Sequence, residues 1–510
     1  MEGFNSPWQL SLASLATIFV ELSIIYWIVY VTYNICFHPL ANIPGPFIWR
    51  ATRLAYVRSF LAGTIVTDVR KLHETYGDVV RVAPDEVSFA RGDVWVDAFG
   101  RNPLPRNATF FKTPPGQPDN LVMTSDISAN ARMRHLISPA FTERSLTRQE
   151  PTIHSYADLL IDGLSKRIRF AGPATNEAVI NTVDWFNWFA FDLVGELAFG
   201  ESFESLRDTR HHPWVMVIFG SIKVMAFAAM TRYYYGVESF LQCLIPPGIR
   251  RMQREHYAIA HDKITRRMAA NDDKDDFVRP LLRGNPNFEK MSLPEVESTM
   301  AIMIIAGSET TATALCGITH CLVQNPDQLR RLEAEIRGHF GKEDEVTIRA
   351  VQNLPFLNAV ILEGLRMCHP VAGGLLRRVP KAGATICGYY LPGHTHVLIS
   401  TAAMSLSETK FHRASEFIPD RFFSDDTRPA EFDGDQRNSQ KPFGVGPRSC
   451  IGKSFALAEL RIALARLIWR FDISKPPGKQ VNWNRLRTLV VVEKKDINIT
   501  IREVRRETEK

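Results

Sequence analysis

A single cysteine, Cys450, stands in a glycine-broken loop that runs directly into a predicted helix, within the stretch PFGVGPRSCIGKSFALAEL at residues 442–460. After the loop, apolar residues recur at three- and four-residue steps, as in a helix with one buried face; they are Leu457, Leu460, Leu464, Leu467 and Phe471. Free amides and the dipole at a helix N-terminus favour an anion, so we expect the Cys450 thiol to ionise readily. The alternative is a buried structural cysteine, the usual role of an isolated thiol. Because no second Cys or His lies at ligand spacing, a structural zinc is not expected.

The composition is that of a large globular protein, with 510 residues, of which 45% are hydrophobic and 23% charged. The net charge of +6 is mildly basic, and no Lys/Arg tract carries interleaved aromatic residues. We therefore expect no nucleic-acid binding, and an acidic protein partner or an anionic membrane surface instead. The 7 cysteines are scattered and odd in number, which indicates a reducing compartment rather than a disulfide framework.

The N-terminal region predicts a membrane anchor. QLSLASLATIFVELSIIYWIVYVTY, residues 9–33, is an apolar stretch of about 25 residues, long enough to cross a bilayer. No Lys or Arg precedes Arg50, so the positive-inside rule places the N-terminus outside and the main body in the cytosol. FHPLANIPGP follows as a stiff, proline-rich hinge. The predicted organisation is an anchor over residues 1–36, a hinge over 37–49 and one main body over 50–510.

The body is predicted to be mainly helical. Ser292 and Glu295 form a capping box that opens a very long helix, which Asn325-Pro326 ends. At ~1.5 Å per residue this helix is about 48 Å long. Residues 78–90 predict a strand pair, and residues 384–399 predict a hairpin that turns at Pro392-Gly393. The acidic stretches at 271–277 and 424–438 are predicted to be solvated loops.

The long helix contains AGSETT, Ala306 to Thr311, within an apolar region. A carboxylate is costly to bury there, and Gly307 weakens a helix, so two local faults coincide. Such a coincidence favours function, with Glu309 and Thr310 relaying protons. The opposing interpretation, that Glu309 reaches the surface or makes a structural hydrogen bond, has equal support from these residues.

Two further motifs are weak when taken alone. In ILEGLRMCHP, Glu363 and Arg366 lie three residues apart and share one helix face. From spacing alone, an exposed ion pair worth under about 1 kcal/mol is the simpler interpretation. FIPDRF places Arg421 between aromatic residues in a turn-like segment.

The motifs together resemble one family. In order, the chain carries an apolar anchor, a proline-rich hinge, AGSETT, Glu-x-x-Arg, F-x-P-x-R-F and F-G-x-G-x-R-x-C-x-G. This closely resembles the cytochromes P-450, the haem-thiolate monooxygenases, over essentially the whole chain. NARMRHLISPAFTERSL and the hinge resemble microsomal members from filamentous fungi that modify secondary metabolites. The implied fold is mainly α with small β-sheets, the cytochrome P-450 fold, plus one N-terminal transmembrane helix, with 50–510 as the haem-thiolate catalytic domain.

The resemblance implies haem b as the cofactor, with Cys450 as the thiolate ligand of its iron. The other residues that it assigns to the cofactor site are Arg134, Arg377, Phe443, Gly446, Arg448 and Gly452. The three arginines would bind the haem propionates. Many relatives carry Trp or His four residues before Arg134, whereas this chain has Asn130, which leaves one propionate contact unaccounted for. Glu363, Arg366 and Arg421 would form a buried triad that braces the cysteine loop.

The implied reaction inserts one oxygen atom from dioxygen into a lipophilic small molecule, by hydroxylation or epoxidation, with Glu309 and Thr310 delivering protons. An NADPH-dependent flavoprotein reductase on the same membrane would supply electrons, and the enzyme would be a single-pass protein of the endoplasmic reticulum with a cytosolic catalytic domain. Basic residues near the thiolate either form the docking face for that reductase or are ordinary solvated charges; they are Lys441, Lys453, Arg461 and Arg466.

The substrate pocket of relatives maps onto largely apolar residues here, which favours a terpenoid or polyketide-derived scaffold; these residues are Ile302, Ala306, Val371, Ala372, Leu375, Leu376 and Leu489. Residues 225–241 either dip into the bilayer or form the roof of this pocket. Two other functions stay open: a reductase-independent haem-thiolate isomerase or dehydratase, and a non-catalytic haem sensor. The intact Glu309-Thr310 pair argues against both.

Overall fold

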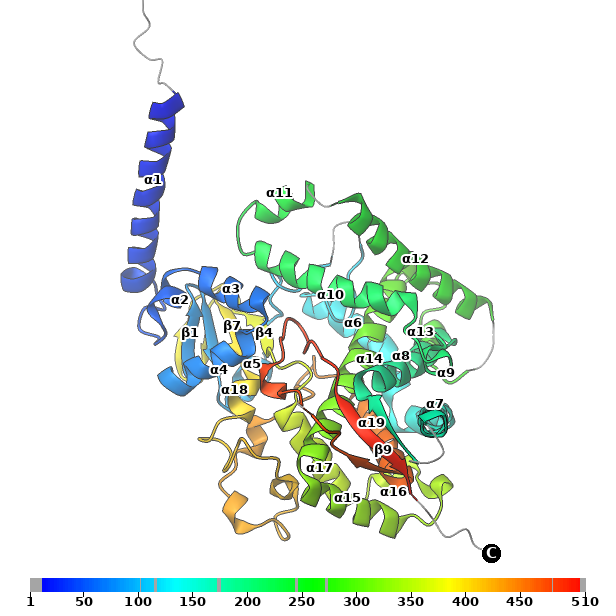
Figure 1. The fold of residues 1–510 in the computed structure, drawn as a ribbon. Coiled ribbons are helices and arrows are strands. Elements are labelled where there is room, and N and C mark those ends of the chain that lie inside the picture. The colour runs from blue at the N-terminus through cyan, green and yellow to red at the C-terminus, as the bar shows by residue number, and fades with distance from the viewer. Residues whose placement is uncertain are drawn as a thin grey trace, which may run out of the picture.

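The computed structural model describes residues 12–504 apart from 101, 114–116, 172–175, 244–245, 271–273 and 479. In this part of the chain, long helices make up most of the body, and short strands form three small sheets (Figure 1). The fold prediction, mainly α with small β-sheets, is therefore confirmed. The helices that form most of the body are α6 (Ile127–Ile137), α7 (Glu143–Ala171), α8 (Thr182–Phe199), α10 (Pro213–Thr231), α12 (Pro247–Ala269), α14 (Leu293–Gln324), α15 (Pro326–His339), α17 (Pro355–Met367) and α19 (Lys453–Arg470).

The other helices of the body connect these elements or cover the sheets. They are α2 (Phe47–Ala51), α3 (Leu54–Ala62), α4 (Ile65–Tyr76), α5 (Val94–Phe99), α9 (Ser205–Asp208), α11 (Val237–Cys243), α13 (Val278–Gly284), α16 (Ile348–Val351) and α18 (Thr401–Ser405).

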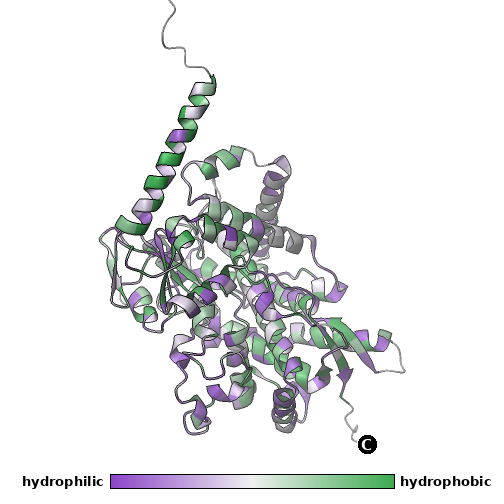
Figure 2. Ribbon diagram, turned by 60° about the vertical axis from the view of Figure 1, so that its left-hand side comes forward, coloured by the Kyte–Doolittle hydropathy of each residue, from purple (hydrophilic) through white to green (hydrophobic). Residues whose placement is uncertain are grey.

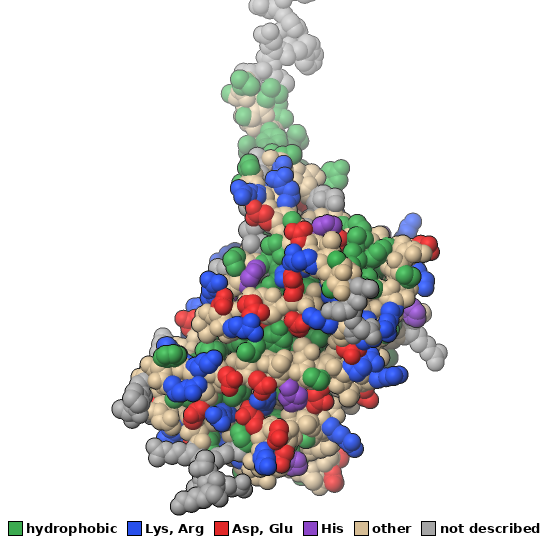
Figure 3. Space-filling model, turned by 90° about the vertical axis from the view of Figure 1, so that its right-hand side faces the viewer, with side chains coloured by type: hydrophobic (Ala, Val, Ile, Leu, Met, Phe, Trp, Pro, Cys, Tyr) green, Lys and Arg blue, Asp and Glu red, His purple; other side chains and the backbone are tan. Residues whose placement is uncertain are grey.

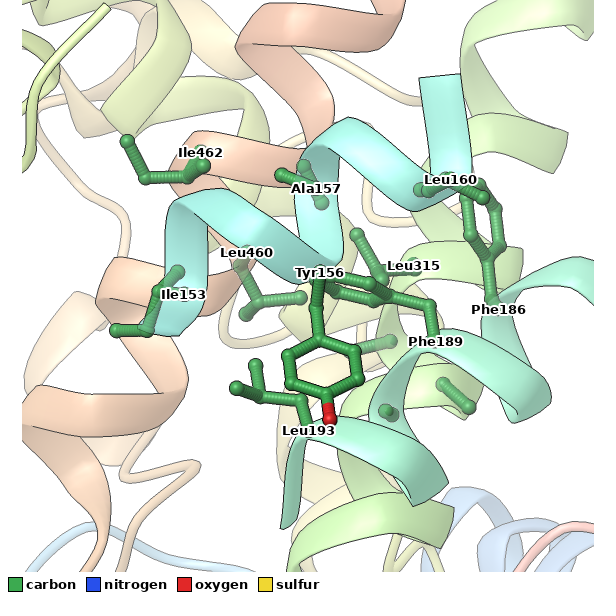
Figure 4. Packing of buried hydrophobic residues seen from close by; sticks show 14 of the residues in the cluster. Ile153, Tyr156, Ala157, Leu160, Phe186, Phe189, Leu193, Leu315, Leu460 and Ile462 are labelled. Carbon is green, nitrogen blue, oxygen red and sulfur yellow. The ribbon is translucent and has the colours of Figure 1, made fainter. Parts of the chain in front are cut away.

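Helix α14 runs through the centre of the body and packs along α8. Ser292 and Glu295 form both hydrogen bonds of the capping box at its start, as predicted, and the helix ends at Gln324. Apolar side chains from four helices meet around its C-terminal half (Figure 4). The labelled residues there are Ile153, Tyr156, Ala157 and Leu160 of α7, Phe186, Phe189 and Leu193 of α8, Leu315 of α14, and Leu460 and Ile462 of α19. The core therefore forms around the helix that carries AGSETT.

The main sheet lies beside the N-terminal helices. Its strands are β1 (Val79–Ala83), β2 (Glu86–Phe89), β7 (His396–Ile399) and β4 (Leu375–Arg378), in that order. The antiparallel pairing of β1 with β2 confirms the predicted strand pair. A second sheet joins β3 (Glu177–Asn181), β9 (Asn498–Glu503) and β8 (Phe471–Ser474).

A hairpin does form within residues 384–399, but its turn does not lie at Pro392-Gly393 as predicted. The hairpin is formed by β5 (Ala384–Ile386) and β6 (Tyr389–Leu391), which pair with each other. Its turn residues Cys387 and Gly388 both have positive φ, 51° and 82°, as a tight two-residue hairpin requires. The Cys387 amide is further held by the Asp97 carboxylate at 2.7 Å. Beyond Pro392-Gly393 the chain instead leaves this hairpin, and β7 pairs with β2 and β4.

Helix α1 (Leu12–Thr32) projects from the body as a single apolar rod (Figures 1 and 2). Together with the π-helical turn Tyr33–Phe37, it is long and apolar enough to cross a membrane, and none of its most apolar window is buried. α14 is also long and apolar enough to cross a membrane, but its most apolar stretch is 72% buried inside the body. The two helices therefore have different roles, α1 as the anchor candidate and α14 as a core helix. Residues 9–11 of the predicted anchor lie outside the described residues.

The proline-rich segment after the anchor packs against the body. Leu40 and Ile43 are buried, and the Pro44 carbonyl accepts a hydrogen bond from the Arg81 amide at 2.7 Å. The Asn34 side chain is also buried and donates to the Ala51 carbonyl at 3.0 Å. These contacts fix the direction in which α1 leaves the body.

Exposed apolar side chains gather at the end of the body from which α1 leaves. Figure 1 shows α1 and α11 at this end. The exposed residues are Phe47, Ile48, Leu54, Phe227, Tyr235, Val237 and Phe240. A different face, shown in Figure 3, instead carries acidic and basic side chains interspersed with one another. An apolar end next to a helix that is long and apolar enough to span a membrane is what a body resting on a bilayer would present.

A buried ionic network crosses the body below the cysteine loop. Glu363 accepts from Arg366 through two bonds, at 2.6 and 2.8 Å, and from Arg421 at 3.2 Å. Arg421 also pairs with Asp435 at 2.5 Å. The four side chains are almost fully buried, so the exposed-pair interpretation drawn from spacing alone was wrong.

The network holds together a segment without long helices. Arg366 donates to the carbonyls of Ser405, Ala414 and Glu416, and Arg421 donates to that of His412. Such a set satisfies each buried charge with several partners, as burial requires.

The acidic loop at 424–438 is only partly solvated, which corrects the prediction for this stretch. Asp435 and Phe432 are buried, and the Asp435 carboxylate also accepts the His412 amide at 2.6 Å. The acidic stretch at 271–277 is corrected in the same way at its end, because Asp276 is buried against Arg267. Sequence reasoning missed both carboxylates because neither stands apart from its exposed acidic neighbours.

Replacing Asp435 with Ala should destabilise the fold. The change leaves the Arg421 charge buried with one carboxylate fewer, and removing one partner of a buried pair costs about 3–5 kcal/mol. We expect a clearly lower unfolding temperature, measured by thermal denaturation. Asp433→Ala is the matched control, because Asp433 lies on the same loop and pairs with Arg428 at an exposed position. Equal effects of the two changes would contradict a special role for Asp435.

Candidate functional site

The cysteine loop is held by its own backbone. The Cys450 amide donates to the Phe443 carbonyl at 2.8 Å, and the Ser449 amide donates to that of Gly446 at 3.0 Å. Gly444 and Gly446 have positive φ, 65° and 74°. At Gly446 a side chain would also collide with α5, since a Cβ there would lie 2.3 Å from the Phe99 carbonyl oxygen. The loop is thereby shaped into a tight bend that ends at Gly452, the N-cap of α19.

Cys450 lies where the loop meets α19, and its side chain is exposed. The surroundings nevertheless raise the pKa of its thiol, because burial by neighbouring atoms outweighs the Gly452 amide, Arg134 and Lys453, all of which favour the thiolate. Burial therefore opposes the ready ionisation that the sequence predicts for this thiol. Coordination to a metal ion would deprotonate the thiol outright.

Arginines from three separate elements lie near this loop. Arg134 of α6 donates to the Ser449 carbonyl at 2.7 Å, which ties α6 to the loop. Arg448 donates to the carbonyls of Thr124 and Asp126 at 2.7 and 2.8 Å. Arg377 of β4 is buried, and its guanidinium lies 4.4 Å from the centre of the Phe99 ring.

Arg106 belongs to the same cluster and was missed by sequence reasoning. Its backbone pairs with that of Arg377 in an isolated bridge, and its guanidinium lies 4.6 Å from the centre of the Phe111 ring. Burial, with Arg448 nearby, lowers the pKa of Arg106 to about 10. Burial and the charges of Arg106 and Arg448 lower that of Arg377 to about 9. No motif marks Arg106, and only the pairing of its strand-like segment with β4 places it here.

This cluster of Arg106, Arg377 and Arg448 has more positive charge than its surroundings compensate. In the described part of the chain, the Nε atoms of Arg106 and Arg377 are buried and have no hydrogen-bond partner. A buried donor without an acceptor is costly, and three repelling guanidinium groups add to the cost. The arrangement suits an anionic group with more than one carboxylate.

Asn130 does not join this cluster. Its side chain is buried and donates to the Leu121 carbonyl at 2.8 Å, so it supports the segment before α6. That segment in turn supplies the carbonyls of Val122 and Thr124 that Arg106 and Arg448 contact.

Helix α14 has an open position in its middle. Ala306 is exposed although residues on either side of it in this helix are mostly buried. The Thr310 hydroxyl donates to the Ala306 carbonyl at 2.6 Å, so the two residues lie on one stripe of the helix. Gly307 faces α8 instead, where a Cβ would lie 3.1 Å from a Val194 methyl group. The close packing of α14 on α8 therefore explains Gly307. Thr310, in contrast, lies next to the open position.

Glu309 has a partner that the motif did not predict. Its carboxylate Oε1 lies 2.5 Å from the Lys494 Nζ, and the same ammonium lies 2.9 Å from the Thr313 Oγ1. The Glu309 and Lys494 side chains are 6% and 3% exposed. In this arrangement Glu309 shares an ion pair with the C-terminal segment, while Thr310 bonds to its own helix. Of the interpretations drawn from sequence, a structural hydrogen bond of Glu309 describes this contact, which is at the same time an ion pair.

Apolar residues from the predicted pocket segments pack together. Leu376 and Leu489 belong to one buried cluster with Ala226, Ala229 and Met230 of α10. Ile302, Val371, Ala372 and Leu375 are partly buried. Residues 225–241 therefore pack on the pocket segments through α10 and also present exposed apolar side chains, among them Phe227 and Phe240.

The predicted basic docking face is only partly present. Arg466 is buried, where it pairs with Asp158 and Glu343, and it cannot belong to an exposed face. Arg461 is partly buried and donates to the Asn358 side chain at 2.8 Å. Lys453 is exposed and Lys441 is partly exposed. The prediction failed for Arg466 because charge was counted without knowing which face of α19 is covered.

Comparison with known proteins agrees with this geometry. Residues 42–501 match the model of the family described as Cytochrome P450. The chain is 37% identical to the versicolorin B desaturase stcL of Emericella nidulans over 94% of this chain and 97% of that protein. It is 34% identical to the cytochrome P450 monooxygenase lcsI of Purpureocillium lilacinum, over 96% and 94%. With astA of Talaromyces wortmannii, also a cytochrome P450 monooxygenase, the identity is 34% over 97% of both chains. The chain therefore belongs to the cytochrome P450 family and is a cytochrome P450 monooxygenase.

Proposed function

We propose that this monooxygenase is a membrane-anchored haem-thiolate enzyme that inserts one oxygen atom from dioxygen into a lipophilic small molecule in fungal secondary metabolism. The observation that carries the proposal is the arginine cluster, in which the buried Nε atoms of Arg106 and Arg377 lack acceptors and to which the cysteine loop itself contributes Arg448. The fungal monooxygenases among its relatives support the metabolic setting.

The residues present fit haem b. Cys450 would ligate the iron, and Arg106, Arg377 and Arg448 would bind the two propionates, which supply the acceptors that the buried Nε atoms of Arg106 and Arg377 need. Arg134 would act indirectly, because it already holds the Ser449 carbonyl of the loop. Phe443 and Gly452 shape the loop on either side of Cys450. When bound, haem supplies the binding and activation of dioxygen.

The protein's own part in the chemistry is to position, to exclude water and to deliver protons. Thr310 lies beside the exposed Ala306, where its hydroxyl would donate a proton into the open position of α14, with Glu309 as the proton source. The apolar pocket segments would hold the substrate and keep out bulk water. Glu363, Arg366, Arg421 and Asp435 brace the segment that leads into the loop, and so act by positioning rather than by contact.

Partners and location follow from the same placement. A separate NADPH-dependent flavoprotein reductase would supply electrons, with Lys441 and Lys453 offering charge near the loop. α1 and the apolar end of the body support a single-pass anchor in the endoplasmic reticulum membrane, with the catalytic domain in the cytosol. The substrate would enter from the membrane, which favours a terpenoid or polyketide-type scaffold.

A second candidate reaction is desaturation of the substrate. Versicolorin B desaturases of two further fungi, Dothistroma septosporum and Aspergillus parasiticus, are also similar, at 38% and 36% identity. In desaturation, dioxygen and two electrons remove two hydrogen atoms from the substrate, and both oxygen atoms leave as water. The two reactions use the same site and differ in whether oxygen stays in the product.

The reaction is tested with the holoenzyme, a reductase and ¹⁸O₂ over a panel of terpenoid and polyketide scaffolds. We expect the reduced, carbon-monoxide-bound protein to show the red-shifted Soret band of thiolate ligation, and product to gain one ¹⁸O atom. A product lighter by two hydrogens and free of ¹⁸O would instead indicate desaturation. Turnover without the reductase would favour the isomerase or dehydratase reading, and ligand binding without any turnover would favour a haem sensor.

Replacing Arg106 with Leu should reduce haem loading. The change removes one of the three guanidinium groups that would bind propionates, so cofactor should dissociate more readily. The measurement is the haem-to-protein ratio after purification and the rate of haem transfer to apomyoglobin. Arg91→Leu is a suitable control, because Arg91 is exposed and pairs only with a nearby carboxylate, that of Asp93. Unchanged haem retention in Arg106→Leu would remove Arg106 from the cofactor site.

Replacing Thr310 with Ala should separate NADPH consumption from product formation. Without the hydroxyl, oxygen leaves as hydrogen peroxide instead of entering the product. Because water partly replaces the lost group, we expect the rate of product formation to fall by about 10²-fold, the low end of the 10²–10⁴-fold range of acid–base catalysis. NADPH, peroxide and product are measured in one reaction. Ser308→Ala is the control, since the Ser308 hydroxyl makes the same kind of bond, to the Ile304 carbonyl at 2.6 Å. If both variants stay equally coupled, Thr310 is only a helix residue.

A further inference from the structure

Lys494 is the unexpected residue at this site. It lies in the segment between the Thr488–Val492 bridge and β9, and its ammonium reaches into the body to Glu309 and Thr313. Glu309 and Thr313 are one helical turn apart, so a single ammonium can bind both. The next residue, Lys495, is exposed. One side chain therefore connects the outside of the C-terminal segment to the helix that carries the acid.

The residue before Lys494 makes a second ion pair, with a different helix. The Glu493 carboxylate lies 2.6 Å from the Lys223 Nζ of α10, and its amide donates to the Arg487 carbonyl at 2.8 Å. α10 is the helix whose Ala226, Ala229 and Met230 pack on the pocket residues Leu376 and Leu489. Adjacent residues of one short segment thus bind the roof of the pocket and the acid of α14.

We infer that Lys494 is a positioning residue that restrains Glu309, and that Glu493 makes this restraint depend on the position of α10. The inference rests on the proposed function, because it concerns the same proton delivery. While the ammonium holds Glu309, the carboxylate is kept from the Thr310 side of the helix. A shift of α10 pulls on Glu493, and the connected Lys494 then releases the acid. Proton delivery is thereby linked to occupation of the pocket.

The geometry favours a restraint over a purely structural bond for a physical reason. A buried ion pair contributes little net stability, because its desolvation cost offsets the attraction between the charges. Stability alone therefore does not explain its presence. Lys494 binds the one carboxylate in AGSETT, and the segment that carries it ends at a strand already held by β3 and β8. The pair is therefore not needed to attach that segment to the body.

The experiment uses the full-length holoenzyme in phospholipid vesicles with an NADPH-dependent flavoprotein reductase and no added organic substrate. The variants are Lys494→Met, Glu309→Gln, the double variant, and Lys495→Met as the matched control on the exposed neighbouring residue. Hydrogen peroxide release and the solvent deuterium isotope effect on NADPH consumption report the restraint. The unfolding temperature reports the ion pair independently of turnover.

In Lys494→Met we expect peroxide release to rise several-fold and the isotope effect to fall, because the acid is no longer held back. In the Glu309→Gln background the same change should have no further effect on either quantity. The unfolding temperature should fall in Lys494→Met and recover in the double variant, which buries no unpaired charge. Lys495→Met should behave as wild type.

A lysine change that lowers peroxide release, or that acts equally in the Glu309→Gln background, would overturn the restraint. Lys223→Met covers the case in which Lys494→Met does not fold, since Lys223 is an exposed residue. It should raise peroxide release by a smaller factor, and no change would overturn the link to α10. Failure of the proposed function is recognised separately, because the wild type would then lack the thiolate Soret band and reductase-dependent NADPH consumption.

Discussion

The buried pair of Glu363 and Arg366 determines how the second half of this protein is arranged. Arg366 leaves the end of α17 and binds three carbonyls of a segment that has few regular elements of its own. Arg421 extends the network to Asp435, and the Gln440 side chain then donates to the Leu362 carbonyl of α17 at 3.1 Å. A segment without helix or sheet hydrogen bonds must find other hydrogen-bond partners for its backbone N–H and C=O groups. Here charged side chains do so, and the cysteine loop begins where their contacts end.

Charge is used in two opposite ways around the site. In the network below the loop, each buried arginine is matched by carboxylates and carbonyls, which makes that region rigid. In the cluster of Arg106, Arg377 and Arg448, guanidinium groups repel one another and two buried Nε atoms lack acceptors. The first arrangement is complete in the protein alone, whereas the second becomes favourable with an anionic ligand. This contrast separates residues that stabilise the fold from residues that bind.

Much of the architecture could be predicted from local pattern, and the failures have physical causes. The capping box at Ser292, the strand pair at 78–90 and the helix after the cysteine loop are specified by neighbouring residues. The hairpin turn was misplaced because Pro392-Gly393 is the more usual turn signal, while Cys387 adopts positive φ with help from Asp97 across the chain. Arg106, Asp435 and Lys494 were missed because their partners are distant in sequence. For the same reason Arg466 was predicted to lie on an exposed face, whereas packing buries its side chain.

Helix α14 has a consequence for how this protein is made. It is as long and nearly as apolar as a membrane-spanning helix, with a mean hydropathy of 1.5 against 2.0 for the anchor. During synthesis at a membrane, the growing chain therefore presents a second segment that the insertion machinery could accept. α8, its main packing partner, is synthesised earlier and is itself rich in aromatic residues. Prompt association of α14 with α8 would keep this helix in the body and out of the bilayer, so the order of elements along the chain favours the finished fold.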